Sequence, residues 1–139
     1  MRPLKGKHIV VGVTAGIAAY KAVELVSRLN KAVAEGKVVM TRNATKFVSP
    51  LVFGEISKHK VAVEMFENIQ DWNVEHIAYA TWADAYVIAP ATANMIAKMS
   101  NGIADDMLST QLLATTAPVF VCPAMNSNMY THPTVQENL

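Results

Sequence analysis

The sequence predicts a three-layer α/β sandwich with a parallel sheet of the Rossmann or flavodoxin-like type. Two observations lead to this fold class. Short, β-rich apolar runs alternate with helical stretches, and few of the connections between them are long. No internal repeat, low-complexity segment or linker is visible, so we expect one domain over residues 1–139. The runs expected to form strands are 8–13, 37–41, 83–89 and 119–122.

The first strand leads directly into a turn of small residues, Thr14-Ala-Gly-Ile-Ala18, and then into a helix expected over 17–34. A tight strand-to-helix turn places free N–H groups and the positive end of a helix at the edge of the sheet. The turn therefore favours a phosphate site. An ordinary strand-to-helix connection with small residues for packing is the alternative.

The end of the second strand helps to exclude two classes of nucleotide. Thr41, Arg42 and Asn43 stand where a dinucleotide-binding domain usually carries an acidic residue for the ribose. The first turn also lacks the G-x-G-x-x-G spacing, and no G-K-[ST] of a P-loop is present. These features disfavour NAD and ATP, and a mononucleotide with one terminal phosphate fits better.

The remaining elements follow from capping residues and apolar periodicity. Thr45 or Ser49 is expected as the N-cap before a helix over 50–57, Asn73 before one over 75–82, and Asp105 or Asp106 before one over 107–114. Adjacent aspartates at such a position usually mark a solvated helix start. An extended piece is expected over 61–66, with further helices over 93–99 and 129–139.

Two strands run into the same pattern of proline, small residues and asparagine, namely Pro90-Ala-Thr-Ala-Asn94 and Pro123-Ala-Met-Asn126. Because proline donates no N–H, each strand is expected to stop there and the chain to turn over the carboxyl edge of the sheet. The repetition suggests a shared pocket. Asn126 in this pocket would grip a carboxylate or a flavin edge, or would only satisfy its own turn.

His76 is expected in the first turn of its helix, where the helix field disfavours the imidazolium. A neutral imidazole there would exchange a proton near pH 7, although a surface or packed core histidine is the simpler interpretation. The histidines show no metal-ligand spacing, so no metal is expected. Cys122 is expected to be a small residue buried in its strand.

Composition limits the classes of partner and compartment. The net charge of +1 gives no support for binding to nucleic acid or to an anionic membrane. The single cysteine excludes an internal disulfide and a cysteine-cluster metal site. No signal peptide or bilayer-length apolar run is recognised, so a cytoplasmic location is expected. With 52% hydrophobic and 17% charged residues, the chain is expected to associate with copies of itself.

Four stretches in order resemble the homo-oligomeric flavin-containing cysteine decarboxylases, and within them the flavoprotein part of phosphopantothenoylcysteine decarboxylases. The resemblance covers nearly the whole chain, and its specific parts are the last block and the histidine in its N-x-x-H-I setting. The four stretches are Gly16-Ile-Ala-Ala-Tyr-Lys21, Asn73-Val-Glu-His-Ile77, Pro90-Ala-Thr-Ala-Asn94 and Pro123-Ala-Met-Asn-Ser-Asn-Met129.

The resemblance implies FMN as the cofactor and assigns a role to each matching residue. It implies His76 as the active-site acid/base and Asn126 as the ligand of the substrate carboxylate. The cofactor would be held by the phosphate turn of Gly16, Ile17 and Ala18, by Thr41, Arg42 and Asn43 beside the flavin, by Thr92, Ala93, Asn94 and Met95 after the later strand, and by the backbone of Met125.

The implied reaction is decarboxylation of 4'-phospho-N-pantothenoylcysteine to 4'-phosphopantetheine in coenzyme A biosynthesis, by a cytoplasmic homotrimer. Relatives carry a further cysteine on a segment that covers the substrate, beyond the point corresponding to Leu139. The chain is therefore expected to be truncated or to lack the final reductive step. Tyr130 stands where many relatives have tryptophan. A flavin prenyltransferase-like enzyme and a non-catalytic FMN-binding regulatory subunit are the alternatives.

Overall fold

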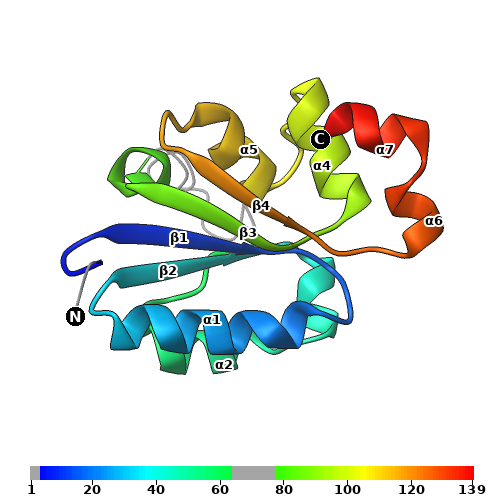
Figure 1. The fold of residues 1–139 in the computed structure, drawn as a ribbon. Helices are drawn as coiled ribbons and strands as arrows, with labels where there is room; N and C mark the ends of the chain where they lie inside the picture. The colour runs from blue at the N-terminus through cyan, green and yellow to red at the C-terminus, as the bar shows by residue number, and fades with distance from the viewer. Residues whose placement is uncertain (1–3, 64–77) are drawn as a thin grey trace.

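Four parallel strands with helices on both faces make up the computed structural model, which describes residues 4–63 and 78–139 (Figure 1). The strand order is β2-β1-β3-β4, and each neighbouring pair is parallel. The predicted α/β sandwich is confirmed. The strands are β1 (His8–Val13), β2 (Glu35–Met40), β3 (Ala85–Ala91) and β4 (Val119–Pro123).

The helices divide between the two faces of the sheet. Figure 1 shows α1 (Ala19–Lys31) and α2 (Pro50–Ser57) on one face, and α4 (Ala93–Asn101) and α5 (Met107–Ala114) on the other. A 3-10 turn, η1 (Asn43–Lys46), follows β2. Two short helices, α6 (Ser127–Tyr130) and α7 (Pro133–Asn138), lie beyond the carboxyl end of β4. Within the described ranges, no helix combines the length and apolarity that a membrane crossing requires.

Alternation along β1 divides the core into two layers, because successive side chains point to opposite faces of a strand. Val11 and Val13 belong to the cluster that packs under α1 and α2, whereas Val10 belongs to the cluster under α4 and α5. Gly12 also faces the second layer, and a Cβ added there would lie 2.8 Å from a methyl carbon of Leu108. The sheet is therefore buried on both sides at β1, which is typical of parallel sheets.

The prediction that a proline ends each of two strands is confirmed for Pro123 and wrong by one residue for Pro90. Pro90 falls within β3, where the register against β4 shifts between Ile88 and Ala91. Pro123 is the last residue of β4 and pairs with Ala91. A proline is tolerated at an irregularity or at a strand end because no ladder N–H is required there.

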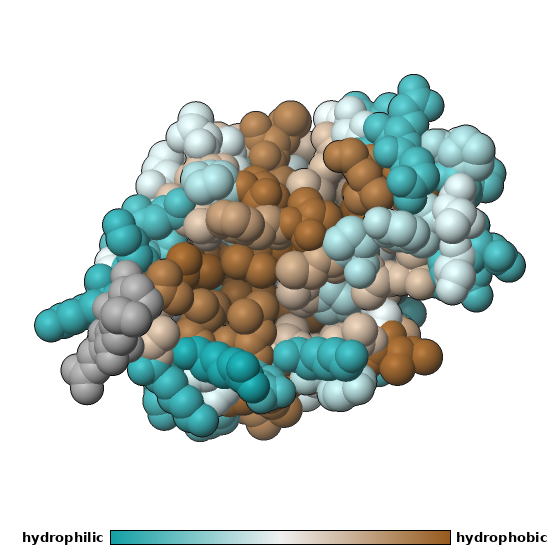
Figure 2. Space-filling view, viewed as in Figure 1, coloured by the Kyte–Doolittle hydropathy of each residue, from teal (hydrophilic) through white to brown (hydrophobic). Residues whose placement is uncertain are grey.

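The strand β4 is the exposed edge of the sheet, which corrects the prediction that Cys122 is buried. Cys122 is exposed, and Phe120 and Val121 are 57% and 36% exposed. The side chains of a strand point to the two faces of the sheet, and among the described elements no helix packs closely over β4. Figure 2 shows hydrophobic residues gathered across the middle of the face that is turned to the viewer in Figure 1.

The helix caps predicted at Ser49 and Asp106 are confirmed, whereas the single helix predicted at the end of the chain is wrong. Ser49 accepts a hydrogen bond from the Leu51 N–H at the start of α2, and Asp106 forms a capping box with Ser109 at the start of α5. The single helix expected over 129–139 is instead α6 and α7, because Pro133 cannot continue a helix but suits the first turn of a new one.

The other boundaries differ by a few residues. The first helix is shorter than the expected 17–34, and the second strand begins two residues earlier than expected. The expected extended piece is represented by Ala62, which bridges to Val39. Residues 78–82 are helical as expected, whereas Asn73 and the start of that helix lie outside the described residues.

A buried hydrogen bond in the second core layer yields a prediction for stability. The Tyr86 hydroxyl donates to Gln111 Oε1 at 2.8 Å, and both side chains are buried. Burial, and to a lesser extent Tyr79, raises the pKa of Tyr86 above its ordinary value, so the hydroxyl stays protonated. Tyr86→Phe should lower the free energy of unfolding by about 1–3 kcal/mol, because Gln111 then loses its partner.

The control is the double variant in which Gln111 is also replaced by Met. Removing both polar partners leaves no orphaned acceptor, and Gln111 Nε2 already lacks a partner in this structure. Urea unfolding should therefore show the double variant to be more stable than Tyr86→Phe alone. Equal stability of the two variants would contradict the importance of this hydrogen bond.

Candidate functional site

Two adjoining hollows lie at the carboxyl edge of the sheet. The first, which we call the polar hollow, has a volume of about 340 Å³ and lies between the ends of β1, β2 and β3 and helix α4. The second, the apolar hollow, has a volume of about 490 Å³ and lies between the start of α1 and the segment after β4. Ala15 and Thr92 line both hollows, so the two adjoin along this edge.

The predicted cofactor residues and the predicted substrate residue Asn126 line these hollows, and Thr92 lines both. One group lines the polar hollow and consists of Thr41, Arg42, Asn43, Thr92, Asn94 and Met95. The other lines the apolar hollow and consists of Gly16, Ile17, Ala18, Thr92, Ala93, Met125 and Asn126. The structure thus brings together the ends of four strands that are far apart in the sequence. His76 lies outside the described residues.

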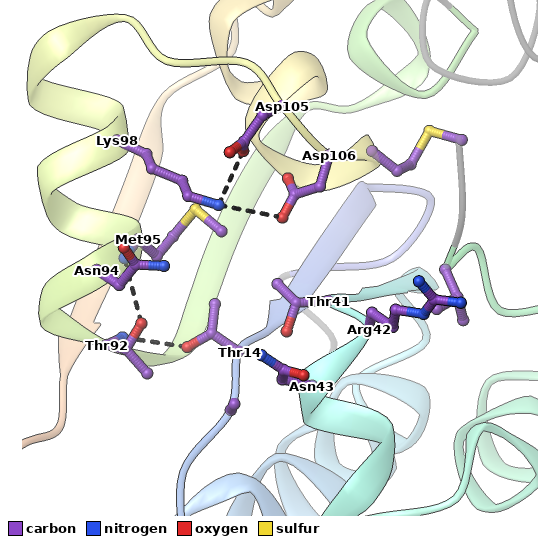
Figure 3. Close-up of a pocket in the computed structure, with 13 residues that line it drawn as sticks. Thr14, Thr41, Arg42, Asn43, Thr92, Asn94, Met95, Lys98, Asp105 and Asp106 are labelled. Atoms are coloured by element: carbon purple, nitrogen blue, oxygen red, sulfur yellow. Dashed lines mark hydrogen bonds and ion pairs between the residues drawn. The ribbon is translucent and has the colours of Figure 1, made fainter. Parts of the chain in front are cut away.

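Thr14 directly follows β1 and links its end to the end of β3 by hydrogen bonds. The sequence alone did not indicate this role. Its side chain is buried, and its hydroxyl donates to the Pro90 carbonyl at 2.5 Å. The same oxygen accepts a hydrogen bond from the Thr92 N–H at 3.1 Å (Figure 3). A single hydroxyl therefore fixes the distance between two strand ends. This role depends on the pairing of β1 with β3, which the local sequence does not show.

Two helix N-termini border the hollows and differ in how they are capped. Thr92 caps α4, because its hydroxyl accepts a hydrogen bond from the Met95 N–H at 3.2 Å. In contrast, α1 begins after Ala18 with no side-chain cap and no acidic residue in its first turn. The N–H groups of a first helical turn have no carbonyl partner within the helix. At the start of α1 the Ala19 N–H donates to the Gly16 carbonyl and the Lys21 N–H to the Ala18 carbonyl, so this end of the helix favours an anion through its dipole more than through free donors.

The residues after β2 lie across the polar hollow from α4, as Figure 3 shows for Thr41, Arg42 and Asn43. The Thr41 hydroxyl accepts a hydrogen bond from the Ala44 N–H at 3.2 Å, which fixes the turn into η1. The Arg42 guanidinium contributes a permanent positive charge to this wall. The sequence prediction that these residues face a ligand agrees with their position on the hollow.

Asn126 serves its own turn and remains able to bind a ligand. Its Oδ1 accepts a hydrogen bond from the Asn128 N–H at 2.8 Å and so caps α6. This bond uses the carbonyl oxygen of the amide, whereas the NH₂ group supplies two further donors. Since Asn126 is exposed and lines the apolar hollow, its amide donors suit a carboxylate there.

Lys98, Asp105 and Asp106 also line the polar hollow, and the sequence analysis missed the lysine altogether. Lys98 Nζ lies 2.8 Å from Asp105 Oδ1 and 3.7 Å from Asp106 Oδ2 (Figure 3). Burial lowers the pKa of Lys98, but the hydrogen bond to Asp105 and the two carboxylate charges outweigh burial, and the net shift is upward. The hydrogen bond to Lys98 lowers the pKa of Asp105.

The donor set of the two hollows fits a phosphate ester joined to a flat ring. Hydroxyls and a guanidinium line the polar hollow, and both kinds of group bind phosphate. The start of α1 lines the apolar hollow. Ile17, Tyr20 and Met129 contribute large apolar side chains to the same hollow, which suits an aromatic ring system.

The comparison with families and curated proteins gives consistent matches. The family model described as Flavoprotein matches residues 1–139. The chain is 50% identical over 136 residues to the coenzyme A biosynthesis bifunctional protein CoaBC of Bacillus subtilis (strain 168), covering 98% of this chain and 34% of that protein. The protein of the same name from Haemophilus influenzae matches at the same identity and coverage. The chain therefore spans about a third of the length of these curated relatives.

Solved structures show the same fold. The structure of the FMN-dependent cysteine decarboxylase SpaF has a TM-score of 0.88 and is 31% identical, covering 97% of this chain and 78% of that one. A mutant of a PPC decarboxylase in complex with pantothenoylaminoethenethiol has a TM-score of 0.83 and is 28% identical, covering 96% of this chain and 75% of that one. These similarities agree with the Rossmann-like sandwich described above.

The Thr14 hydroxyl yields a prediction for the integrity of the site. Thr14→Val should lower the free energy of unfolding by about 1–3 kcal/mol, because the buried Pro90 carbonyl and the Thr92 N–H would both lose a partner. Thr14→Ser keeps the hydroxyl and is the matched control. Chemical unfolding of the three proteins measures the difference. If Val were tolerated as well as Ser, the hydroxyl would not join the strand ends as described.

Proposed function

Because this chain belongs to the flavoprotein family, we propose that it binds FMN across the two hollows and decarboxylates 4'-phospho-N-pantothenoylcysteine to 4'-phosphopantetheine. The observation that carries the proposal is that a phosphate-suited hollow adjoins an apolar one at the carboxyl edge of the sheet, which is where such sheets bind ligands. The printed names of the CoaBC relatives and of the cysteine and PPC decarboxylase structures support the reaction.

The cofactor residues are those that the sequence predicts, but the roles of two groups of them change. Arg42 and the hydroxyls of Thr41 and Thr92 favour the phosphate end of FMN in the polar hollow, beside Ala15 at the start of α1. The ring then occupies the apolar hollow. Thus Arg42 serves the phosphate, although the sequence interpretation put it beside the flavin. Gly16, Ile17 and Ala18 line the apolar hollow and serve the ring, although the sequence interpretation made them the phosphate turn.

The remaining proposed contacts to FMN are assigned by which hollow each residue lines. Ring contacts come from the apolar hollow, and further contacts to the phosphate or its chain come from the polar one. The proposed ring residues are Gly16, Ile17, Ala18, Ala93 and Met125, and the proposed residues at the other end are Asn43, Asn94 and Met95.

The reaction needs an electron sink, because loss of CO₂ from the cysteine carboxylate leaves a carbanion beside a saturated carbon. When bound, FMN would supply a hydride acceptor, so that the substrate CH₂–SH becomes a thioaldehyde whose C=S group can receive the electron pair left by CO₂. The same two electrons would return to the resulting enethiol to give 4'-phosphopantetheine, so no net oxidation occurs. The chain itself orients the substrate against the ring and moves protons. We assign the substrate carboxylate to the NH₂ group of Asn126 and the proton transfer to His76.

We also propose that the chain acts as a cytoplasmic homotrimer. Apolar side chains exposed near the apolar hollow support self-association, since Ile17 is 83% and Tyr20 is 59% exposed. Large apolar residues gathered on a surface mark an interaction site. The proposed association would cover these side chains next to the ring of the cofactor.

A direct test of the proposed function combines FMN titration with turnover. The purified chain should quench FMN fluorescence on binding, and anaerobic addition of 4'-phospho-N-pantothenoylcysteine should bleach the flavin absorbance or release CO₂. His76→Asn should retain FMN binding and slow these changes by about 10²–10⁴-fold, the usual share of an acid/base group. Full activity in this variant would remove His76 from the mechanism.

The same experiment separates the alternatives. A prenylated flavin in the mass spectrum, formed after addition of dimethylallyl phosphate, would indicate a flavin prenyltransferase-like enzyme. FMN binding without any substrate turnover would indicate a non-catalytic subunit. Each of these results would contradict the decarboxylase assignment.

Asn126 yields a prediction about substrate affinity. Asn126→Asp keeps a good N-cap for α6, because an aspartate oxygen also accepts a hydrogen bond from the Asn128 N–H. The new carboxylate repels the substrate carboxylate and replaces the NH₂ donors. The KM for the substrate should rise by about tenfold or more while FMN affinity stays unchanged. An unchanged KM would place the substrate carboxylate elsewhere.

A further inference from the structure

Lys98 and two aspartates form an ion-pair cluster on the wall of the polar hollow that the proposed function does not use. Lys98 lies on α4, and its side chain is only 17% exposed. Asp105 and Asp106 lie immediately before α5 and approach Nζ from the other side, at 2.8 and 3.7 Å. Figure 3 shows Lys98 reaching across the top of the hollow towards both carboxylates.

The charges around the hollow explain why this cluster matters. Among the residues that line it, Arg42 and Lys98 are basic and Asp105 and Asp106 are acidic, so the formal charges cancel. Without Lys98, two carboxylates would face a phosphate group across a partly enclosed space. Asp106 is only 28% exposed and would repel a phosphate more strongly than Asp105, which is 60% exposed and better screened by water. The hollow accepts a dianion only if something neutralises these carboxylates.

We propose that Lys98 is a positioning residue that holds and neutralises Asp105 and Asp106, so that the polar hollow accepts the phosphate end of FMN. The inference rests on the proposed function, because it concerns the same cofactor. Lys98 acts through the two aspartates and not as a direct ligand of the phosphate, since its ammonium group is already engaged by both carboxylates.

The titration behaviour of the cluster agrees with this role. The hydrogen bond to Lys98 holds the pKa of Asp105 below its ordinary value of 3.8, whereas the pKa of Lys98 is raised above 10.5. The charged pair is therefore complete at neutral pH. It is lost as the pH falls through the lowered pKa of Asp105, or as the pH rises through the raised pKa of Lys98.

A comparison of two flavins tests the proposal, because riboflavin has the ring of FMN but no phosphate. Lys98→Met should weaken FMN binding by about tenfold or more and leave riboflavin binding within about twofold of the wild type. Lys98→Arg keeps the charge and should retain FMN binding. Dissociation constants come from quenching of flavin fluorescence. Equal losses for both flavins in Lys98→Met would overturn the proposal in favour of a merely structural role.

A triple variant distinguishes neutralisation from direct contact. Adding Asp105→Asn and Asp106→Asn to Lys98→Met removes the repelling carboxylates, and asparagine still caps α5. This variant should bind FMN better than Lys98→Met. If it bound FMN as weakly as Lys98→Met, Lys98 would contact the phosphate directly and the positioning role would be overturned.

Two further proteins complete the design. The double variant Asp105→Asn with Asp106→Asn should bind FMN more tightly than the wild type and riboflavin equally, and it keeps the test decisive if Lys98→Met does not fold. Arg28→Met is the matched control, since Arg28 forms an exposed helix pair with Glu24 and should leave both affinities unchanged. A wild-type chain that bound no FMN would overturn the proposed function, whereas FMN binding unaffected by Lys98→Met would overturn only this inference.

Discussion

The hydroxyl of Thr14 is the contact on which the arrangement of the site depends. It links the Pro90 carbonyl to the Thr92 N–H and thereby fixes the tip of β1 against the tip of β3. Ala15, which follows it, and Thr92 are the two residues that line both hollows. Because the first turn of α1 and the first turn of α4 both start from this junction, a shift of one strand end would move both helix N-termini relative to each other.

Parallel strands make such a junction possible. The carboxyl ends of neighbouring parallel strands lie at the same edge of a sheet, and each continues into a helix whose N–H groups face that edge. In this chain β1, β2 and β3 supply the polar hollow, whereas the segment after β4 supplies the apolar one. The start of α1 lines the apolar hollow as well, so the segment after β1 contributes to both hollows, and Thr92 also lines both.

Electrostatics adds a second constraint. The polar hollow contains acidic as well as basic side chains, and the acidic ones are tied to a lysine that is largely buried. Asp106 has two tasks, since it caps α5 through Ser109 and also faces Lys98. Helix capping alone explains an aspartate before α5, which is why the sequence offered no reason to look for a partner on α4.

Local patterns in the sequence determined the fold class, most element boundaries and the caps at Ser49 and Asp106. They also indicated that the residues directly after the strands form the candidate site. These features depend on neighbours within a few residues, such as apolar alternation and the oxygen of a capping side chain. Only the tertiary structure decided that Thr14 bridges two strands, that Lys98 reaches Asp105, and that Cys122 lies on an exposed edge. The contacts of Thr14 and Lys98 join residues that come close in space only after the sheet and its helices have packed. The exposure of Cys122 depends on strand order, which leaves β4 at the edge of the sheet.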